Sequence, residues 1–298
     1  MKVLLTGSSG LVGTSLLPLL AHNGYTVTRL VRTQASGLNL FWDPDAGMLE
    51  AGSLEGHDAV VHLAGESIAT GRWTEAKKRR ILDSRVKGTR LLSDAIAGLK
   101  NPPKVFVSAS AIGFYGDRGD EVMKENSAAG NGFLPDVCKQ WEAATASAAQ
   151  KGVRVVNLRI GVVLTPKGGA LAKMLLPFKL GLGGIIGSGK QFMSWITLDD
   201  VLGAIVCALK TDALRGPVNA VSPKPLSNAE YTRTLGRVLS RPTIIPMPAF
   251  AARLAFGQMA DDLLLASTRV EPGELLKNGY RFLYPDLEAA LQHLISKN

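Results

Sequence analysis

Residues 2–13 read KVLLTGSSGLVG. Lys2–Thr6 is a short apolar run typical of a buried strand, glycines follow at positions 7, 10 and 13, and Leu11 starts a leucine-rich helical pattern that ends near Gly24. A dinucleotide pyrophosphate needs this arrangement, because glycines allow close backbone approach and the helix N-terminus offers unpaired N–H groups and partial positive charge. The residues expected to cradle it are Gly7, Ser9, Gly10, Leu11, Val12 and Gly13.

Strand-like and helix-like patterns alternate after this turn. The predicted strands are Thr26–Val31, Leu38–Trp42, Ala59–Leu63, Val105–Val107 and Val153–Leu158. The predicted helices are Thr74–Leu99, bent near Gly88, then Phe133–Gln150, Asp199–Lys210 and Ala249–Phe256. Alternation of this kind predicts right-handed βαβ units, hence an α/β fold with a Rossmann-like, doubly wound parallel sheet.

The pattern changes after Leu164, where a glycine-rich stretch spans residues 181–189. We therefore expect a Rossmann-like domain over residues 1–165, to which segments around 191–222 return, and a smaller, partly helical C-terminal substrate domain over 166–298. The glycine-rich stretch is interpreted either as a flexible loop that covers substrate or as a turn-rich connection. Lys179 and Lys190 flank it and would suit an anionic substrate.

The end of the second strand indicates which dinucleotide is bound. An acidic residue there would bind the ribose 2′-hydroxyl of NAD, but this chain has Arg32 about 19 residues after Gly13. A guanidinium can pair with a 2′-phosphate, so the sequence favours NADP(H). The alternative is a solvated arginine at a strand end.

The composition is that of a globular protein. The 298 residues are 46% hydrophobic. The combined share of glycine and proline, from 32 and 15 residues, is below the roughly 25–30% that is typical of disordered chains. The net charge is +9, and residues 72–90 hold eight basic side chains against two acidic ones. Since Trp73 is the only aromatic residue there, we interpret the run as a solvated helix face and expect no nucleic-acid partner.

Cysteine and histidine usage gives no sign of a disulfide framework or a metal centre. Cys138 and Cys207 form no CxxC motif, and the four histidines lack ligand spacing, so no metal is expected. The apolar run before Gly7 is too short for a signal peptide, and no window reaches the roughly 18 apolar residues of a membrane span. The sequence predicts a cytoplasmic protein with no membrane partner.

Further motifs resemble the extended short-chain dehydrogenase/reductase superfamily, in its nucleotide-sugar epimerase branch. Residues 6–13 resemble its TGxxGxxG loop, 58–65 its DxVxHLAA strand, 108–116 its SSSxxxYG segment, 158–163 its LRxxNVYG segment and 195–201 its WIHVDDV segment. Gly65-Glu66, Trp141-Glu142 and residues 177–189 are similar to the atypical epimerase-family subgroup, which has a characteristic C-terminal extension. The residues that this resemblance places around the nucleotide are Leu63, Ala64, Gly65, Arg85, Ser108, Arg159 and Val163.

The superfamily's catalytic positions are only partly kept. Ser110 matches the serine that hydrogen-bonds the reacting oxygen, but Leu134 and Cys138 stand where the Tyr-xxx-Lys pair belongs, and Arg85 stands at the position of the asparagine. Arg85 would contact cofactor phosphate or a substrate anion, or form a salt bridge within its helix.

Tyr115 and Glu66 are the other catalytic candidates. Tyr115 is interpreted as a proton donor or as an aromatic packed beneath the cofactor. Glu66 is interpreted as a catalytic carboxylate, a helix cap, or a partner of Arg72 or Arg85.

The resemblance implies an NADP(H)-binding oxidoreductase or epimerase-like enzyme that acts on a small molecule, either a carbonyl compound or a sugar nucleotide. The missing Tyr-xxx-Lys pair supports an alternative, a non-catalytic NADP(H)-binding sensor or regulatory protein. An oligomer is compatible with either function.

Overall fold

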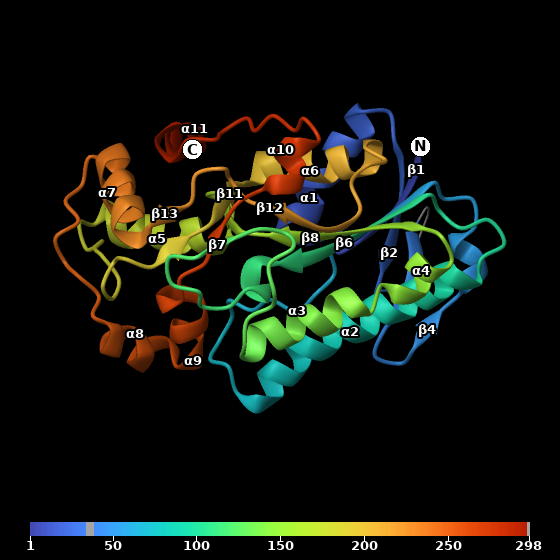
Figure 1. Cartoon of the computed structure of the whole chain (residues 1–298), viewed down its shortest axis with the longest axis horizontal. Coiled ribbons are helices and arrows are strands. Elements are labelled where there is room, and N and C mark those ends of the chain that lie inside the picture. The colour runs from blue at the N-terminus through green and yellow to red at the C-terminus, as the bar shows by residue number, and fades with distance from the viewer. Residues whose placement is uncertain (34–38, 297–298) are drawn as a thin grey trace.

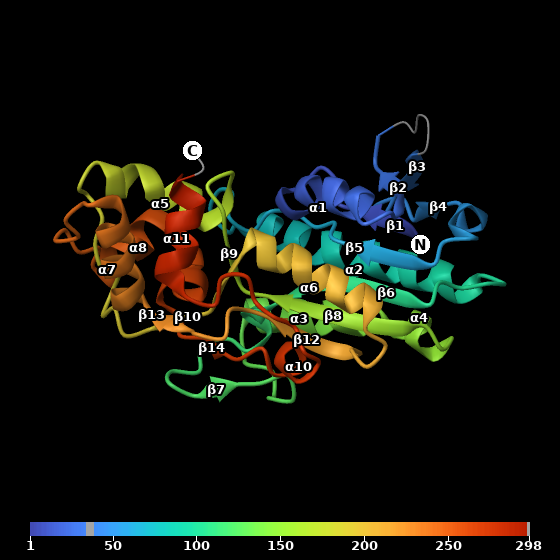
Figure 2. The ribbon, with the colours of Figure 1, turned by 90° about the horizontal axis from the view of Figure 1, so that it is seen from above.

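The computed structural model describes residues 1–33 and 39–296, and its centre is a large sheet (Figures 1 and 2). Within these residues the sheet has eight strands in the order β12-β8-β6-β5-β1-β2-β3-β4. All neighbours are parallel except the β3–β4 hairpin. The strands are β1 (Lys2–Thr6), β2 (Thr26–Val31), β3 (Asn39–Asp43), β4 (Met48–Leu49), β5 (Ala59–His62), β6 (Val105–Ala111), β8 (Arg154–Ile160) and β12 (Gly216–Ala220).

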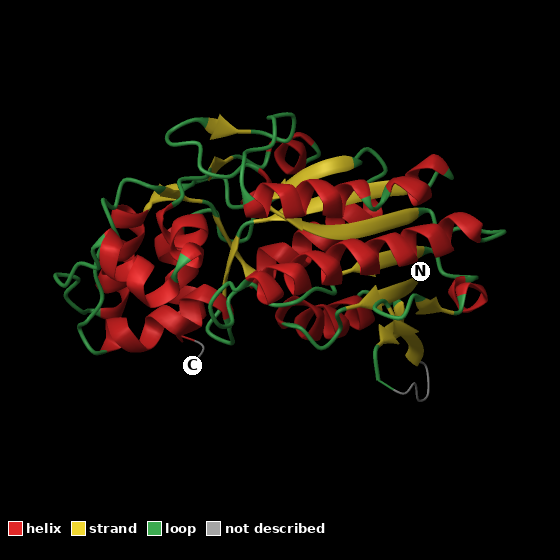
Figure 3. Cartoon of the chain, turned by 90° about the horizontal axis from the view of Figure 1, so that it is seen from below, coloured by secondary structure: helices red, strands yellow, loops and turns green. Residues whose placement is uncertain are grey.

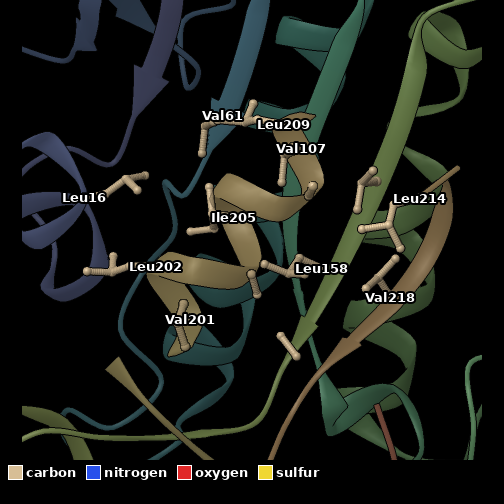
Figure 4. Packing of buried hydrophobic residues seen from close by; sticks show 14 of the residues in the cluster. Leu16, Val61, Val107, Leu158, Val201, Leu202, Ile205, Leu209, Leu214 and Val218 are labelled. Carbon is tan, nitrogen blue, oxygen red and sulfur yellow. The ribbon is translucent and has the colours of Figure 1, made fainter. Parts of the chain in front are cut away.

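Helices cover both faces of the sheet, as Figure 3 shows. One face carries α1 (Leu11–His22) and α6 (Leu198–Lys210), and the other carries α2 (Glu75–Gly98), α3 (Phe133–Ala143) and α4 (Ala146–Gln150). Figure 4 shows that Val201, Ile205 and Leu209 of α6 lie over the strands and pack against Val61, Val107 and Leu158. Because side chains on both faces of the sheet are buried, the sequences of its strands are continuous hydrophobic runs.

A smaller lobe of helices lies at one end of the sheet (left in Figure 1). Its elements are α5 (Gly169–Lys179), α7 (Asn228–Leu239), α8 (Ala249–Phe256), α9 (Gln258–Ala260), a π-helical turn over Asp261–Leu265 and α11 (Leu287–Ser296). Its core is built around Leu171, Phe178, Tyr231, Leu235 and Leu291. The chain leaves this lobe at residue 195, crosses the sheet face through α6 and adds β12 to the sheet edge before it returns.

Short elements join the lobe to the sheet. They are β7 (Val122–Met123), β9 (Val162–Leu164), β10 (Phe192–Met193), β11 (Trp195–Thr197), β13 (Leu226–Ser227), β14 (Arg269–Val270) and α10 (Gly273–Lys277). Single turns of 3-10 helix lie at Ala51–Leu54 and Ile112–Phe114. β9 pairs with β11 and β7 with β14, so segments distant in sequence meet at the carboxyl end of the sheet.

The α/β fold with a helical C-terminal lobe is confirmed, and two local predictions need correction. Residues 75–98 are one unbroken helix, because Gly88 is not a bend: a Cβ there would lie 3.3 Å from the Trp42 ring, so glycine lets α2 pack closely. The predicted helix 133–150 is two helices, α3 and α4. The start of the strand predicted at Leu38 lies outside the described residues, and β3 spans Asn39–Asp43.

Among the described helices, none combines the length and the apolar character that crossing a membrane requires.

Candidate functional site

The glycine turn after β1 is held tightly against the end of β5. The Thr6 hydroxyl accepts hydrogen bonds from the backbone N–H groups of Leu63 and Ala64, at 3.1 and 3.3 Å. Gly7 has a φ of +67°, and a Cβ there would lie 2.6 Å from the Leu63 carbonyl carbon. A Cβ at Gly13 would lie 2.2 Å from the Gly7 oxygen. Both positions require glycine, for backbone conformation and for space.

The N-terminus of α1 is open to a ligand. Gly10 is its N-cap and supplies no side chain, while Ser9 and Gly10 are exposed and Leu11 and Val12 are half-buried. The first N–H groups of a helix have no intrahelical acceptor, and no side chain caps them here. This turn therefore fits an anionic group such as a pyrophosphate.

β2 and the residue after it supply two arginines, Arg29 and Arg32. Arg29 donates from Nε to the Ser8 hydroxyl at 2.9 Å, which brings its guanidinium to the glycine turn. Arg32 follows the strand and is exposed. Neither position carries an acidic side chain that would repel a phosphate, so both residues fit the 2′-phosphate of NADP.

Residues 63–66 follow β5 and form the wall of the predicted nucleotide site that lies across β1 from Arg29 and Arg32. Leu63 and Ala64 are half-buried and Gly65 is exposed. Arg85, on α2, donates to the backbone oxygen of Glu66 at 2.9 Å and lies over the Trp141 ring at 5.0 Å. Arg85 therefore holds residues 63–66 in place through the backbone oxygen of Glu66. This contact is neither the phosphate contact nor the salt bridge within its helix that the sequence suggested.

The Glu66 side chain is paired with Lys77, not with Arg72 or Arg85. Lys77 Nζ lies 2.5 Å from Glu66 Oε1 and also donates to the Thr70 hydroxyl at 3.0 Å. The Lys77 hydrogen bond, assisted by the charges of Lys77, Arg80 and Arg32, holds the pKa of Glu66 below its usual range. Glu66 is thus an ionised carboxylate at the edge of the crevice.

A buried polar network lies at the end of β6. The Ser110 hydroxyl donates to Glu142 Oε1 at 2.7 Å. Arg159, on β8, binds the same carboxylate through two bonds of 2.8 Å, Nε to Oε1 and a terminal nitrogen to Oε2. Ser110 and Arg159 are each 3% exposed. A planar guanidinium held in this way fixes the carboxylate, and the carboxylate fixes the serine hydroxyl.

Tyr115 is part of the support for that network. It is fully buried, donates to Asn219 Oδ1 at 2.7 Å and accepts from Arg159 at 2.9 Å. Burial raises the pKa of its hydroxyl, although Arg159 opposes the shift. A substrate cannot reach this hydroxyl without displacing its partners, so the structure gives Tyr115 a packing role.

Three further residues predicted around the nucleotide are engaged within the protein. The Arg159 guanidinium donates hydrogen bonds to Glu142 and Tyr115, so it is not a cofactor contact in this arrangement. Ser108 is fully buried within β6, and its hydroxyl donates to the Ala109 oxygen at 3.3 Å. Val163 is half-buried in β9 and pairs with Ile196.

The glycine-rich stretch is a packed connection. Added Cβ atoms would lie 2.6 Å from the Phe178 ring at Gly183 and 1.8 Å from the Ile245 oxygen at Gly184. These glycines hold the stretch against α5 and against the segment before α8. The flexible covering loop considered from the sequence is therefore not what the structure shows.

Comparison with known proteins identifies the family. The model of the "NAD dependent epimerase/dehydratase family" matches residues 3–220. The chain belongs to this epimerase/dehydratase family. A domain of unknown function, DUF1731, matches residues 247–294, the C-terminal extension that the sequence predicted.

Family members of similar length occur in bacteria and animals. The Mycobacterium bovis "Epimerase family protein Mb2239" is 42% identical over 99% of this chain and 98% of its own length. The human "Epimerase family protein SDR39U1" is 38% identical over 99% of this chain and all of its own length.

Solved structures share the fold of this chain. The crystal structure of human SDR39U1 (isoform 2) with NADPH has a TM-score of 0.91 at 36% identity, with both chains fully covered. UDP-N-acetylglucosamine 4-epimerase from Bacillus cereus, 17% identical over 99% of this chain and 98% of its own, has a TM-score of 0.75. The latter likeness shows the fold alone.

The epimerase/dehydratase family's Tyr-xxx-Lys positions are apolar here, and α3 presents them to the turn after β6. A Cβ at Gly113 would lie 3.3 Å from Leu134 Cβ and 3.8 Å from Cys138 Sγ. Burial raises the pKa of the Cys138 thiol to about 12. Neither side chain can exchange a proton near neutral pH. Ser110 and Glu142 are polar groups on the same two elements, β6 and α3.

Sequence reasoning missed two residues of this site. Arg29 lies inside the second strand, and nothing local shows that its side chain turns toward the glycine turn. Glu142 was noted only as part of a family motif, and its partners lie 32 and 17 residues away.

Proposed function

We propose that this member of the epimerase/dehydratase family is an NADP(H)-dependent oxidoreductase or epimerase-like enzyme. One observation carries the proposal: Arg29 reaches the glycine turn beside the uncapped N-terminus of α1, and Arg32 follows the same strand, β2. Pyrophosphate and 2′-phosphate need these two features. The human relative crystallised with NADPH supports the same choice.

Different residues would hold the different parts of the cofactor. Backbone groups of the turn from Gly7 to Gly13 would receive the pyrophosphate, Arg29 and Arg32 the 2′-phosphate, and Leu63–Gly65 would line the nucleotide. Bound nicotinamide would supply or accept a hydride.

Ser110 is the group we propose to contact the reacting oxygen of the substrate. An ionised carboxylate only accepts hydrogen bonds, so the Ser110 proton points to Glu142 and the serine lone pairs are left for a substrate hydroxyl. Glu142 thus orients the Ser110 hydroxyl, and Arg159 keeps the carboxylate in place. Glu142 acts through Ser110 and is a positioning residue.

Two other aspects of the function are proposed. The substrate is a small molecule, and the two free thiols, Cys138 and Cys207, suit the cytoplasm. The rival hypothesis is a non-catalytic NADP(H) sensor, which the apolar residues at the Tyr-xxx-Lys positions favour.

Titration of NADPH and NADH into the purified protein tests the cofactor. Replacing Arg29 or Arg32 by alanine removes a charge-assisted phosphate contact of about 1.5–3 kcal/mol, so NADPH affinity should fall roughly ten- to a hundredfold, with NADH affinity little changed. Lys151→Ala, at an exposed site after α4, is the control. Equal wild-type affinities for the two cofactors would refute the assignment.

Turnover separates the enzyme from the sensor. The protein is incubated with NADPH and carbonyl compounds, and with NADP and alcohols or sugar nucleotides. Turnover that is lost in Ser110→Ala and shifts its pH profile in Glu142→Gln supports the enzyme. Tight NADPH binding without turnover across the panel supports the sensor.

A further inference from the structure

Exposed apolar side chains are concentrated on one part of the C-terminal lobe. Of the thirteen large apolar side chains that are exposed in the described residues, eight lie in two short segments, 176–182 and 244–254. Those eight are Leu176, Leu180, Leu182, Ile244, Ile245, Met247, Phe250 and Leu254. We call this set the lobe patch.

The two segments of the lobe patch lie side by side. A Cβ at Gly181 would lie 3.8 Å from the Pro242 ring, and Gly184 packs on the Ile245 carbonyl. Backbone hydrogen bonds join Met247 to Ile185 and Gly187 to Met247, both at 2.9 Å. Residues 180–187 therefore form one surface with residues 242–247.

The helices α5 and α8 adjoin this surface and reach the same loop. Lys173 on α5 donates to the Ala69 oxygen at 2.5 Å, and Arg72 donates to the Leu254 oxygen on α8, so both helices reach one loop, residues 69–72. Each exposes an apolar pair four residues apart, Leu176 with Leu180 and Phe250 with Leu254, and such pairs lie on one helix face.

Positive charges outnumber negative ones around the lobe patch. Residues 166–198 contain four lysines and residues 231–260 four arginines, with no acidic residue in either segment. Asp261 and Asp262 follow directly, Arg253 pairs with Asp261 at 2.8 Å, and Arg237 pairs with Glu288 at 2.5 Å. Lys179, Lys190 and Arg241 are exposed beside the apolar side chains. Apolar side chains rimmed by cations are the surface that an anionic bilayer attracts and receives.

Exposure distinguishes this surface from the lining of a ligand pocket. Ile244 is 80% exposed, Leu254 75% and Phe250 72%. Side chains that line a small-molecule pocket are shaded by its walls, whereas these project into solvent. They suit a broad apolar layer that the protein meets from outside.

The same charges disfavour a second copy of this chain as the occupant. A two-fold dimer through the lobe patch would place the same surface on both sides of the interface. Most of the charges brought together would then be lysines and arginines, because only Asp261 and Asp262 adjoin these segments and Asp261 already pairs with Arg253.

We propose that the lobe patch docks this protein on the surface of anionic lipid bilayers. The aliphatic and aromatic side chains enter the interface, and the cations contact lipid phosphates. This docking is peripheral, and it departs from the expectation, drawn from the sequence, that the protein has no membrane partner.

Vesicle sedimentation tests the proposal with the full-length protein. Vesicles of phosphatidylcholine alone are compared with vesicles containing 30% phosphatidylglycerol, a composition about one-third anionic. We expect binding to the anionic vesicles only, with release in about 0.5 M salt, where the Debye length falls to a few ångströms. Absence of binding to the anionic vesicles overturns the proposal.

Matched variants locate the binding surface. The double variant Ile244→Ser/Phe250→Ser should lower the partition coefficient at least tenfold, and Lys179→Gln/Lys190→Gln should lower it and flatten its salt dependence. The controls Met48→Ser/Leu283→Ser and Lys100→Gln/Lys151→Gln change exposed side chains elsewhere and should bind as the wild type does.

Two further outcomes contradict the proposal. Patch variants that bind vesicles as well as the controls would show that another surface is responsible. A wild-type dimer in light scattering that the apolar variant converts to a monomer would assign the lobe patch to a second copy. Circular dichroism confirms that each variant is folded, which is expected because the changed side chains are exposed.

Discussion

Replacing Glu142 by glutamine removes the negative charge that faces Arg159 and keeps the size of the side chain. The glutamine oxygen can keep one of the two 2.8 Å bonds from the guanidinium, and the other is lost. The Arg159 side chain is 4% exposed and that of Glu142 is 13% exposed, so water cannot compensate. Breaking a buried ion pair costs about 3–5 kcal/mol, and with one bond kept we expect a loss of about 3 kcal/mol.

Urea unfolding followed by circular dichroism measures this loss as a change in the free energy of unfolding. The control is Glu121→Gln, which breaks the Arg118–Glu121 pair, where the Glu121 side chain is 57% exposed. That change should cost less than about 1 kcal/mol, because solvent screens exposed pairs. The double variant Glu142→Gln/Arg159→Met should be more stable than Glu142→Gln alone, since it also removes the buried positive charge.

A loss below about 1 kcal/mol for Glu142→Gln, equal to that of the exposed control, would refute the reasoning. It would mean that the Ser110–Glu142–Arg159 network is solvated. The proposed positioning of Ser110 by Glu142 would then also be wrong.

Three further predictions follow from single contacts. Burial lowers the pKa of His62 from 6.5 to about 4, so its neutral form stabilises the fold above about pH 6.5, and about 3 kcal/mol should be lost as the pH falls towards 4. Urea midpoints between pH 7 and pH 4 should fall less in His62→Gln than in the wild type, and parallel curves would contradict this. Gly13→Ala should lower the thermal midpoint well below that of Gly10→Ala, because the added Cβ lies 2.2 Å from the Gly7 oxygen in the first variant and 3.3 Å in the second. Similar midpoints for these two variants would show that the turn can open. The Cys138 thiol, with a pKa raised to about 12, should react with iodoacetamide at pH 8 at least about a hundredfold more slowly in the folded than in the urea-unfolded protein, as measured by peptide mass mapping, and rapid labelling would contradict its burial.

Much of the fold could be predicted from the sequence because the signals are local. β1 ends at Thr6 and α1 begins at Leu11, as the apolar run and the glycine spacing indicate. β2 and α8 also have their predicted bounds. Periodicity reports which side of an element is buried, and that depends on neighbours within a few residues. The α/β/α arrangement, a sheet with helices on both faces, follows from the alternation of such elements.

Other features depended on contacts between segments far apart. Gly88 marks a bend by propensity, yet Trp42 packs against it and the helix continues. Ser110 could be named from its motif, but not its bond to Glu142. Tyr115 and Arg159 were assigned to the reaction and the cofactor, and the structure engages them with each other and with Asn219 and Glu142.

The amino-acid sequence by itself determined the strand, glycine turn and helix that would receive a dinucleotide, together with the arginine at position 32. Only the tertiary structure decided that Arg29 reaches Ser8, that Glu142 holds Ser110, and that the leucines and isoleucines of the lobe patch face solvent. The reason is physical: an element's conformation is set largely by its own residues, whereas a side chain's partner and exposure depend on which distant segments fold against it.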